Sequence, residues 1–409
     1  MIAATIRANP YGWIVVGICF VSLMLVYAVR SSLGLMMPFW EDDPGWTRDL
    51  SSNAGALVLV LMAISSPVAG NLIDRYGPRA VCSAGLMCLG IGVFAVTISS
   101  EAWHLILAYG GLIGIGAGTI AMPMVSAAVA IYFKSNQGLA SGIGFSGATG
   151  GQLFAMPVLG MLVTWIGWRG TYVAMFVAIF MFAVAVWLML RSGKPREVTR
   201  EASVRGSLGI RLKKLGTSST FWLLFVGFIV CGFTTAGVIE VHLLPYAELC
   251  GFGAIEGATA YGIHGGFNMI GVILCGFLAD RMHRPRLLAG LYFARVILFV
   301  MLFYVAGNLP LLFFFAAAFG FTSFATLPVL ASIVASRIGV GIMGLAMGII
   351  FAGHWAGAAF GAFLGGELYR LYANYDWMWI VALLAVLFAG FLSLCIPEER
   401  HRDMVPKLA

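Results

Sequence analysis

The chain has 409 residues, of which 61% are hydrophobic and only 10% are charged, and its mean hydropathy is +0.97. Soluble domains carry about 25% charged residues, so this composition excludes a soluble globular protein and indicates a membrane protein. The net charge of +7 at pH 7 then calls for a topological explanation, and we expect no nucleic-acid partner.

The apolar runs divide at charges, prolines and glycine pairs into about twelve segments, each near or above the ~20 residues that cross a bilayer. Residues 1–10 show no cleavage-site pattern, so we expect the first segment to be retained. The expected spans are about 13–40, 50–74, 79–99, 103–133, 138–165, 170–191, 219–248, 256–280, 287–307, 309–336, 341–370 and 377–396.

A polar interval at 192–216, rich in Lys and Arg, separates the first half of these spans from the second. It is typical of a solvated linker and has room for a surface helix. We therefore predict an all-α membrane protein with twelve transmembrane helices in two pseudo-symmetric six-helix bundles. The predicted domains are an N-terminal bundle at 1–191, a basic cytoplasmic linker at 192–216, and a C-terminal bundle with a short cytoplasmic tail at 217–409.

The charged loops fix an expected orientation. With the N-terminus in the cytoplasm, most of the 24 Lys and Arg residues fall on the cytoplasmic side. The opposite loops carry acids such as Asp42, Glu101, Glu256 and Asp376. This asymmetry follows the positive-inside rule, so we expect a multi-pass protein of the plasma (inner) membrane with both termini cytoplasmic.

A short charged motif occurs twice, at 70–79 and again 206 positions later at 276–286. Glycines permit a tight turn and close helix approach, while Asp74 can accept hydrogen bonds from an arginine or from the N-terminus of a neighbouring helix. We interpret the motif as a conformational latch; a merely hydrated loop is less consistent with two copies at one offset. Its members are Gly70, Asp74, Arg75, Gly77, Arg79, Gly276, Asp280 and Arg281.

This repeated motif resembles that of the major facilitator superfamily, and the resemblance covers the whole chain. Stretches at 30–34, 45–48, 138–142 and 242–246, together with His354, resemble the bacterial relatives of the monocarboxylate transporter family. That resemblance implies an Asp and an Arg in helix 8, where this chain has Asn268 and Val272 instead. The arginine that the family uses for the substrate carboxylate is therefore missing from its usual place.

Inserting an ionisable residue into an apolar span costs about 2.5–3.5 kcal/mol on insertion scales. Each such residue therefore needs a structural or functional explanation. Arg30, with Tyr27 on the same helical face, is a candidate substrate residue; the alternative is snorkelling to the outer headgroups. Arg295 lies near mid-bilayer, where a structural pairing within the C-terminal half is as plausible as substrate contact.

Other polar residues complete the candidate set. His354 is a candidate for substrate binding or proton transfer, against a packing role. His264 and Asn268 share one face of their helix and either line a cavity or bond neighbouring helices. Glu240 and Gln152 are also candidates, and for each a purely structural role is equally plausible. We expect substrate binding by Arg30, Tyr27, Gln152, Asn268, Arg295 and His354, and proton coupling by His264, Glu240 or His354.

The function predicted is secondary active transport of a small organic anion, a monocarboxylate, by alternating access with proton coupling. Export of an amphipathic or aromatic compound is the alternative, although residues 147–151 lack the Gly-Pro pairing that the drug-antiporter resemblance requires. A non-transporting membrane sensor with this fold is a further alternative. We expect no enzymatic activity, cofactor or metal, since no catalytic motif is present and the seven cysteines show no C-x-x-C spacing. The expected partners are the anion, protons and membrane lipids, and we expect a monomer.

Overall fold

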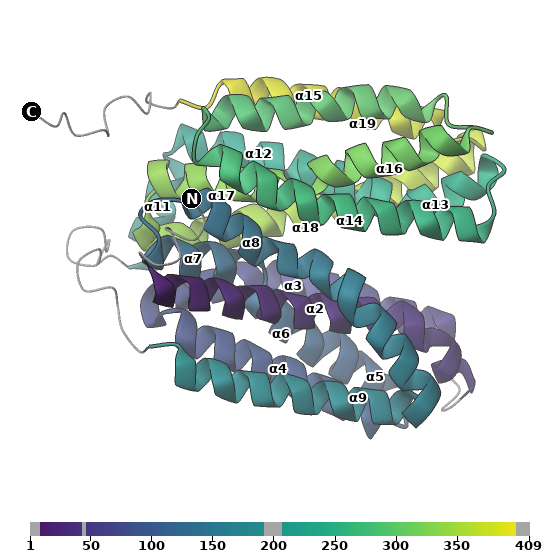
Figure 1. Ribbon diagram of the computed structural model, residues 1–409, viewed down its shortest axis with the longest axis horizontal. Coiled ribbons are helices and arrows are strands. Elements are labelled where there is room, and N and C mark those ends of the chain that lie inside the picture. The colour runs from purple at the N-terminus through teal and green to yellow at the C-terminus, as the bar shows by residue number, and fades with distance from the viewer. Residues whose placement is uncertain (1–8, 43–45, 192–206, 398–409) are drawn as a thin grey trace, which may run out of the picture. The chain divides into compact units, whose positions relative to one another are not determined.

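The structure is a computed structural model that describes residues 9–42, 46–191 and 207–397 (Figure 1). Parts of the predicted linker (192–206) and tail (398–409), the N-terminal residues 1–8 and the loop residues 43–45 lie outside the described residues. Every regular element within the described ranges is helical. The predicted all-α class is thereby confirmed.

The helices before the linker follow the predicted spans closely. Several spans are built from consecutive helical pieces, including π-helical turns, which are rare and often occur at functional sites. The pieces are α2 (Pro10–Asp42), α3 (Arg48–Tyr76), α4 (Pro78–Thr97), α5 (Ala102–Leu105), η1 (Ile106–Ile113), α6 (Gly114–Ile120), α7 (Met122–Tyr132), α8 (Gln137–Gly150), η2 (Gly151–Ala155) and α9 (Met156–Met189).

The fifth and sixth predicted spans form one continuous stretch of 53 residues, Gln137–Met189. At 1.5 Å per residue such a helix would be about 80 Å long, more than twice the ~30 Å hydrocarbon core. The stretch is broken at Gly167, whose φ of 70° and ψ of 173° are non-helical. This break separates two crossings, so the 11 long apolar helices found in the described residues correspond to the twelve predicted spans.

The helices after residue 206 begin with α11 (Leu208–Gly216), a short basic helix that lies in the predicted linker region and buries Leu215 while Lys213 and Lys214 are exposed. The membrane-crossing pieces that follow again match the predicted spans. They are α12 (Ser219–Gly232), η3 (Phe233–Ile239), α13 (Glu240–Leu249), α14 (Ala254–Ala279), α15 (Arg284–Leu302), α16 (Leu309–Ser323), α17 (Thr326–Arg337), η4 (Val340–Ile342), α18 (Met343–Tyr372) and α19 (Asp376–Leu394).

The contacts divide the chain into two compact units. The first takes in the described residues of Met1–Lys134, Ile143–Arg205 and Val340–Trp355; the second takes in those of Ser135–Gly142, Gly206–Gly339 and Ala356–Ala409. Within the first unit α4 and α9 run side by side, and within the second α15 and α19 do so (Figure 1). The first half of α18 thus packs within the first unit and its second half within the second.

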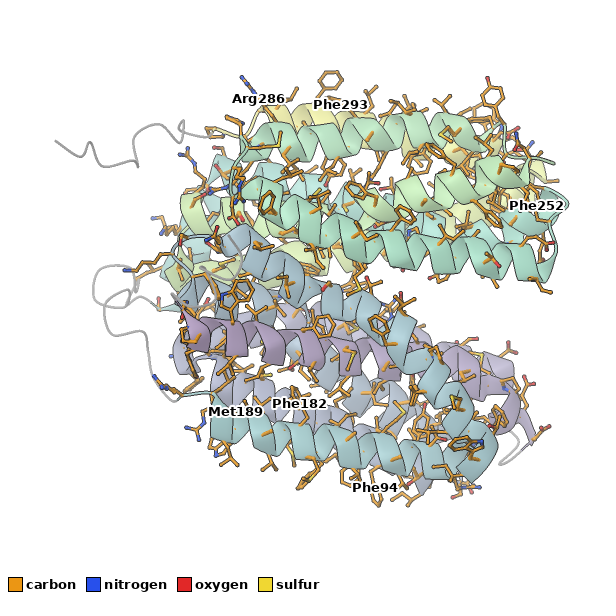
Figure 2. All side chains as sticks on the ribbon, viewed as in Figure 1. Phe94, Phe182, Met189, Phe252, Arg286 and Phe293 are labelled. Carbon is orange, nitrogen blue, oxygen red and sulfur yellow. The ribbon has the colours of Figure 1, made fainter. Side chains whose placement is uncertain are left out.

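Apolar side chains cover the outside of these helices. Phe94 and Val177 are exposed, and the sticks in Figure 2 show the labelled Phe94 on the outside of its helix. An aqueous protein would bury such surfaces, whereas a helix in lipid tails has no hydrophobic reason to do so. The exposed apolar surface fits a multi-pass membrane protein.

Two helices break within about one turn of equivalent positions in the repeat. In the first unit, α6 ends at Ile120 and α7 begins at Met122, followed by Pro123. In the second, α16 ends at Ser323 and α17 begins at Thr326. Within the membrane, backbone N–H and C=O groups that lose their helical hydrogen bonds at a break must bond to neighbouring protein groups. Several predicted site residues lie at the second break.

Candidate functional site

Arg30 stands on a well-anchored stretch of α2. The Tyr109 hydroxyl, from η1, donates to the carbonyl oxygens of Val29 at 2.9 Å and of Arg30 at 3.3 Å. Two residues on, the Ser32 hydroxyl donates to Val29 at 2.7 Å and lies 2.9 Å from the Tyr172 hydroxyl. Since the single Ser32 proton is used on the carbonyl, Tyr172 is the donor in the second contact. The backbone that carries Arg30 is therefore held from two neighbouring elements.

The half-buried guanidinium of Arg30 lies against two aromatic rings. Its central carbon is 5.5 Å from the ring centroid of Tyr27 and 5.1 Å from that of Trp355. Both distances are within the range of a cation–π contact with the ring face, and the N–H donors of a guanidinium project in its plane. Within the described residues no carboxylate pairs with Arg30 and no acceptor for its side-chain N–H groups is recorded. The arrangement orients the cation and leaves its hydrogen-bonding edge for another acceptor.

The helix that supplies Trp355 also carries His354. The buried imidazole of His354 lies 5.7 Å from the Phe351 ring and 5.3 Å from the Trp355 ring, centroid to centroid. The predicted residues Arg30, Tyr27 and His354 thus all belong to the first unit. Trp355 was missed from the sequence, because a tryptophan in an apolar span gives no signal until its neighbour on another helix is known.

Gln152 lies in the π-helical segment η2, which packs closely on α2. A Cβ atom on the preceding residue, Gly151, would lie 2.4 Å from the Met24 carbonyl oxygen and 3.0 Å from the Tyr27 Cβ. Only glycine permits this approach. The segment that carries Gln152 therefore meets α2 at the turn that bears Tyr27, and the side chain of Gln152 is partly exposed.

In the second unit, Arg295 on α15 hydrogen-bonds to the end of the broken helix. Its guanidinium is 0% exposed and donates to the carbonyl oxygens of Thr322 at 2.5 Å and Ser323 at 2.7 Å, with the Cys231 sulfur at 3.4 Å. These carbonyl groups belong to the last turn of α16. The last C=O groups of a helix have no hydrogen-bond partner within it, and together with the negative end of the helix dipole they favour a cation. Arg295 thus uses Nη2 on two backbone acceptors at the α16–α17 break, while its buried Nε has no partner in the described residues.

His264 and Asn268, one turn apart on α14, contact the same break. The His264 Nε2 lies 3.0 Å from the Ser323 hydroxyl oxygen, and the Asn268 side-chain oxygen accepts from the Phe324 backbone N–H at 3.1 Å. Both side chains are buried. The structure therefore brings His264, Asn268 and Arg295 together around one interrupted helix.

The first unit has apolar residues at the positions equivalent to these three, although the Ser66 hydroxyl donates to the Gly118 carbonyl oxygen at 3.4 Å near its break. At the repeat offset of 206, Arg295 corresponds to Leu89, His264 to Val58 and Asn268 to Met62. A Cβ on Gly116 would lie 2.5 Å from the Leu89 backbone nitrogen, and one on Gly118 2.8 Å from the Met62 Cα. Close glycine packing in the first unit thus takes the place of the arginine, histidine and asparagine of the second.

Glu240 begins α13 directly after the π-helical η3, and its side chain is partly exposed. The nearby His242 is buried, and its Nε2 lies 3.2 Å from the Ala362 carbonyl oxygen. Both belong to the second unit.

The first copy of the repeated motif docks on a helix N-terminus. The Asp74 carboxylate accepts from the backbone N–H groups of Gly344 at 2.9 Å and Leu345 at 3.0 Å, in the first turn of α18. A Cβ on Gly70 would lie 2.0 Å from the Gly344 carbonyl oxygen, so the two helices cross glycine on glycine. Gly77 has a φ of 82°, a conformation that favours glycine.

The second copy repeats this geometry within the second unit. The Asp280 carboxylate accepts from Gly138 N at 2.7 Å and Leu139 N at 2.9 Å at the start of α8, and Gly276 crosses Gly138. Burial raises the pKa of the Asp280 carboxyl above its usual value, and the two backbone donors oppose that shift.

The arginines of the motif make other contacts. Arg75 is exposed, the Arg79 guanidinium carbon lies 4.2 Å from the Trp187 ring centroid, and Arg281 donates to the Phe277 carbonyl oxygen at 3.0 Å on its own helix.

Comparison with known proteins places this geometry in a family. The sequence profile of the Major Facilitator Superfamily matches residues 19–308. Among curated relatives, the uncharacterized MFS-type transporter YcxA of Bacillus subtilis is 25% identical over 396 residues, covering 95% of both chains. Monocarboxylate transporter 13 of Rattus norvegicus is 26% identical, covering 97% of this chain and 93% of its own length.

Solved structures share the fold. The E. coli fucose:proton symporter FucP matches with a TM-score of 0.75 at 15% identity, covering 93% of this chain and 98% of its own. The proton:xylose symporter XylE matches with a TM-score of 0.74 at 15% identity, covering 95% and 96%. The chain therefore belongs to the Major Facilitator Superfamily and is a multi-pass membrane secondary transporter, not an enzyme.

Proposed function

We propose that this transporter moves a small organic anion, a monocarboxylate, by alternating access coupled to protons. The observation that carries the proposal is Arg30, a half-buried cation in the first span. Its guanidinium lies over the rings of Tyr27 and Trp355, and no carboxylate in the described residues pairs with it. Such a cation is costly in a membrane span. A bound carboxylate would offset that cost through a two-pronged hydrogen bond with the guanidinium fork.

The other intramembrane arginine supports this choice indirectly. Arg295 is fully buried and donates to the carbonyl oxygens of Thr322 and Ser323, so its guanidinium is held by the protein itself. Arg30 is left as the better anchor, replacing the helix 8 arginine whose expected position holds Val272. The similarity to monocarboxylate transporter 13 supports the same substrate class.

Proton coupling needs a group that can gain and lose a proton. Of the three candidates, His264 and His354 are each 4% exposed, whereas Glu240 is partly exposed. A proton carrier must exchange its proton with water, so we place Glu240 first. The proton symporters FucP and XylE share the fold, which makes a proton gradient the natural driving force to test.

The experiment is thermal stabilisation of the purified protein across a panel of monocarboxylates, amines and neutral solutes. A ligand at a hundred times its Kd adds about 2.7 kcal/mol to stability, and we expect this only for monocarboxylates. Matched esters or amides of the active compounds serve as controls because they lack the negative charge. Stabilisation by amines or neutral solutes with none by carboxylates would overturn the proposed substrate.

The same proposal places both termini in the cytoplasm, as the charge asymmetry predicts. In a background with the exposed Cys395 and the partly exposed Cys88 and Cys250 replaced by serine, Lys213→Cys is expected to react with a membrane-impermeant maleimide only after the cells are opened. Asp42→Cys should react in intact cells. Both positions are exposed, so the reverse pattern would invert the topology.

We also propose that the Asp74 contact with the start of α18 is a latch that stabilises one conformation. Asp74→Asn removes the charge from hydrogen bonds worth about 1.5–3 kcal/mol, and we expect normal expression with transport slowed about tenfold. Asp74→Glu, which keeps the charge, is the control. Uptake kinetics in Asp74→Asn equal to wild type would reduce the motif to a topological signal.

A further inference from the structure

We propose that Trp355 is a substrate-binding residue that reads a second acceptor atom on the anion held by Arg30. The proposal rests on the proposed function, since it needs an anion at Arg30. It assigns Trp355 two parts: its ring face contacts the guanidinium, and its indole N–H donates to an oxygen of the substrate outside the carboxylate.

The first part follows from the contact geometry. The Arg30 guanidinium carbon lies 5.1 Å from the Trp355 ring centroid, and tryptophan is the best aromatic partner for a cation. Together with the Tyr27 ring at 5.5 Å, this contact limits the directions in which the fork can point. A preorganised cation loses less side-chain entropy when the anion binds.

The second part follows from the indole nitrogen. Trp355 is only 6% exposed, and within the described residues its N–H has no hydrogen-bond partner. A buried donor without an acceptor costs about 1–3 kcal/mol, and indole nitrogen can only donate. An acceptor oxygen brought in by the substrate would remove that cost.

Other buried indoles distinguish a ligand role from simple packing. Trp40 and Trp379 also have N–H groups with no partner in the described part of the chain, but their rings contact aromatic residues. Trp168 likewise has a buried N–H with no partner there, and the Arg169 guanidinium carbon lies 4.4 Å from its ring centroid, but that arginine is its neighbour in the chain. Trp355 instead contacts a cation whose own donors have no recorded acceptor there. Trp355 thus combines a cation from another helix with a buried donor that has no partner in the described residues.

The consequence is selectivity for carboxylates that carry a further oxygen. A site built to hydrogen-bond a substrate oxygen discriminates against the analogue that lacks it, because its donor is then left buried and unsatisfied. Butanoate and its 2-, 3- and 4-hydroxy derivatives share the carboxylate and place the extra oxygen at increasing distances from it. One of the hydroxy isomers should bind about tenfold more tightly than butanoate, the effect of one hydrogen bond.

The test compares the affinities of these four probes in wild type, Trp355→Phe and Trp379→Phe by isothermal titration calorimetry. Trp355→Phe keeps a ring against Arg30 but removes the N–H, so within this variant the hydroxy isomer should bind no more tightly than butanoate, whatever the loss of affinity that all four probes share. Trp379→Phe removes an equivalent buried N–H elsewhere and should keep the preference. A melting temperature for each variant confirms that it is folded.

The possible outcomes separate the role of Trp355 from the proposed substrate class. A wild-type preference that survives in Trp355→Phe, or no preference among the probes in wild type, would overturn the role of Trp355 and leave the anion proposal standing. Wild-type protein that binds none of the monocarboxylate panel would remove the proposed function, and this inference with it.

Discussion

Replacing Arg30 with alanine is expected to abolish binding of the monocarboxylates identified in the ligand panel. The guanidinium fork supplies the positive charge and the paired donors that a carboxylate needs in a low-dielectric site. Loss of charged hydrogen bonds worth about 1.5–3 kcal/mol would weaken binding by at least about tenfold. Arg30→Lys keeps the charge but loses the fork, so its affinity should fall between those of the alanine variant and wild type. Calorimetric affinity measured in detergent checks all three proteins.

The control for Arg30→Ala is its melting temperature, which shows whether the variant is folded. The backbone around it is held by Tyr109 and Tyr172 through other groups, so Arg30→Ala should melt within a few degrees of wild type. Near-normal affinity in Arg30→Ala, together with binding lost in a well-folded Arg295→Ala, would move the anchor into the second unit.

Arg295→Ala is expected to destabilise the protein far more than it changes affinity. The substitution leaves the carbonyl oxygens of Thr322 and Ser323 without their donor at a fully buried position. Each unsatisfied buried acceptor costs about 1–3 kcal/mol, and the lost side-chain volume adds a cavity. We expect a loss of about 3 kcal/mol or more, seen as a clear fall in the apparent melting temperature.

Arg295→Leu separates the two causes. Leucine is the residue at the corresponding position of the first repeat, Leu89, and it restores apolar volume without donors. If the hydrogen bonds to the α16 carbonyls are what matters, Arg295→Leu should remain nearly as unstable as Arg295→Ala. Recovery of wild-type stability in the leucine variant would show that Arg295 only fills space.

The membrane-spanning helices are the part of the fold that could be predicted from the sequence. Span lengths and loop charges depend on each segment's own composition, because a lipid bilayer imposes one thickness on every helix. All the predicted spans, including the pair joined through Gly167, were therefore recovered. The division into bundles at 1–191 and 217–409 stays a prediction, since the contacts group 340–355 with the first unit and 135–142 with the second.

The sequence alone also singled out Arg30, Arg295, His264 and Asn268, because polar groups in apolar spans are costly wherever they point. Their roles depended on the tertiary structure. A helix break at Ser323 and its neighbours cannot be located from composition, so the sequence could not show that Arg295 serves backbone acceptors. Trp355 carries no charge and no motif, and only its packing against Arg30 distinguishes it from a lipid-facing tryptophan. Burial costs are local properties of a residue, whereas partners are set by which helices pack together.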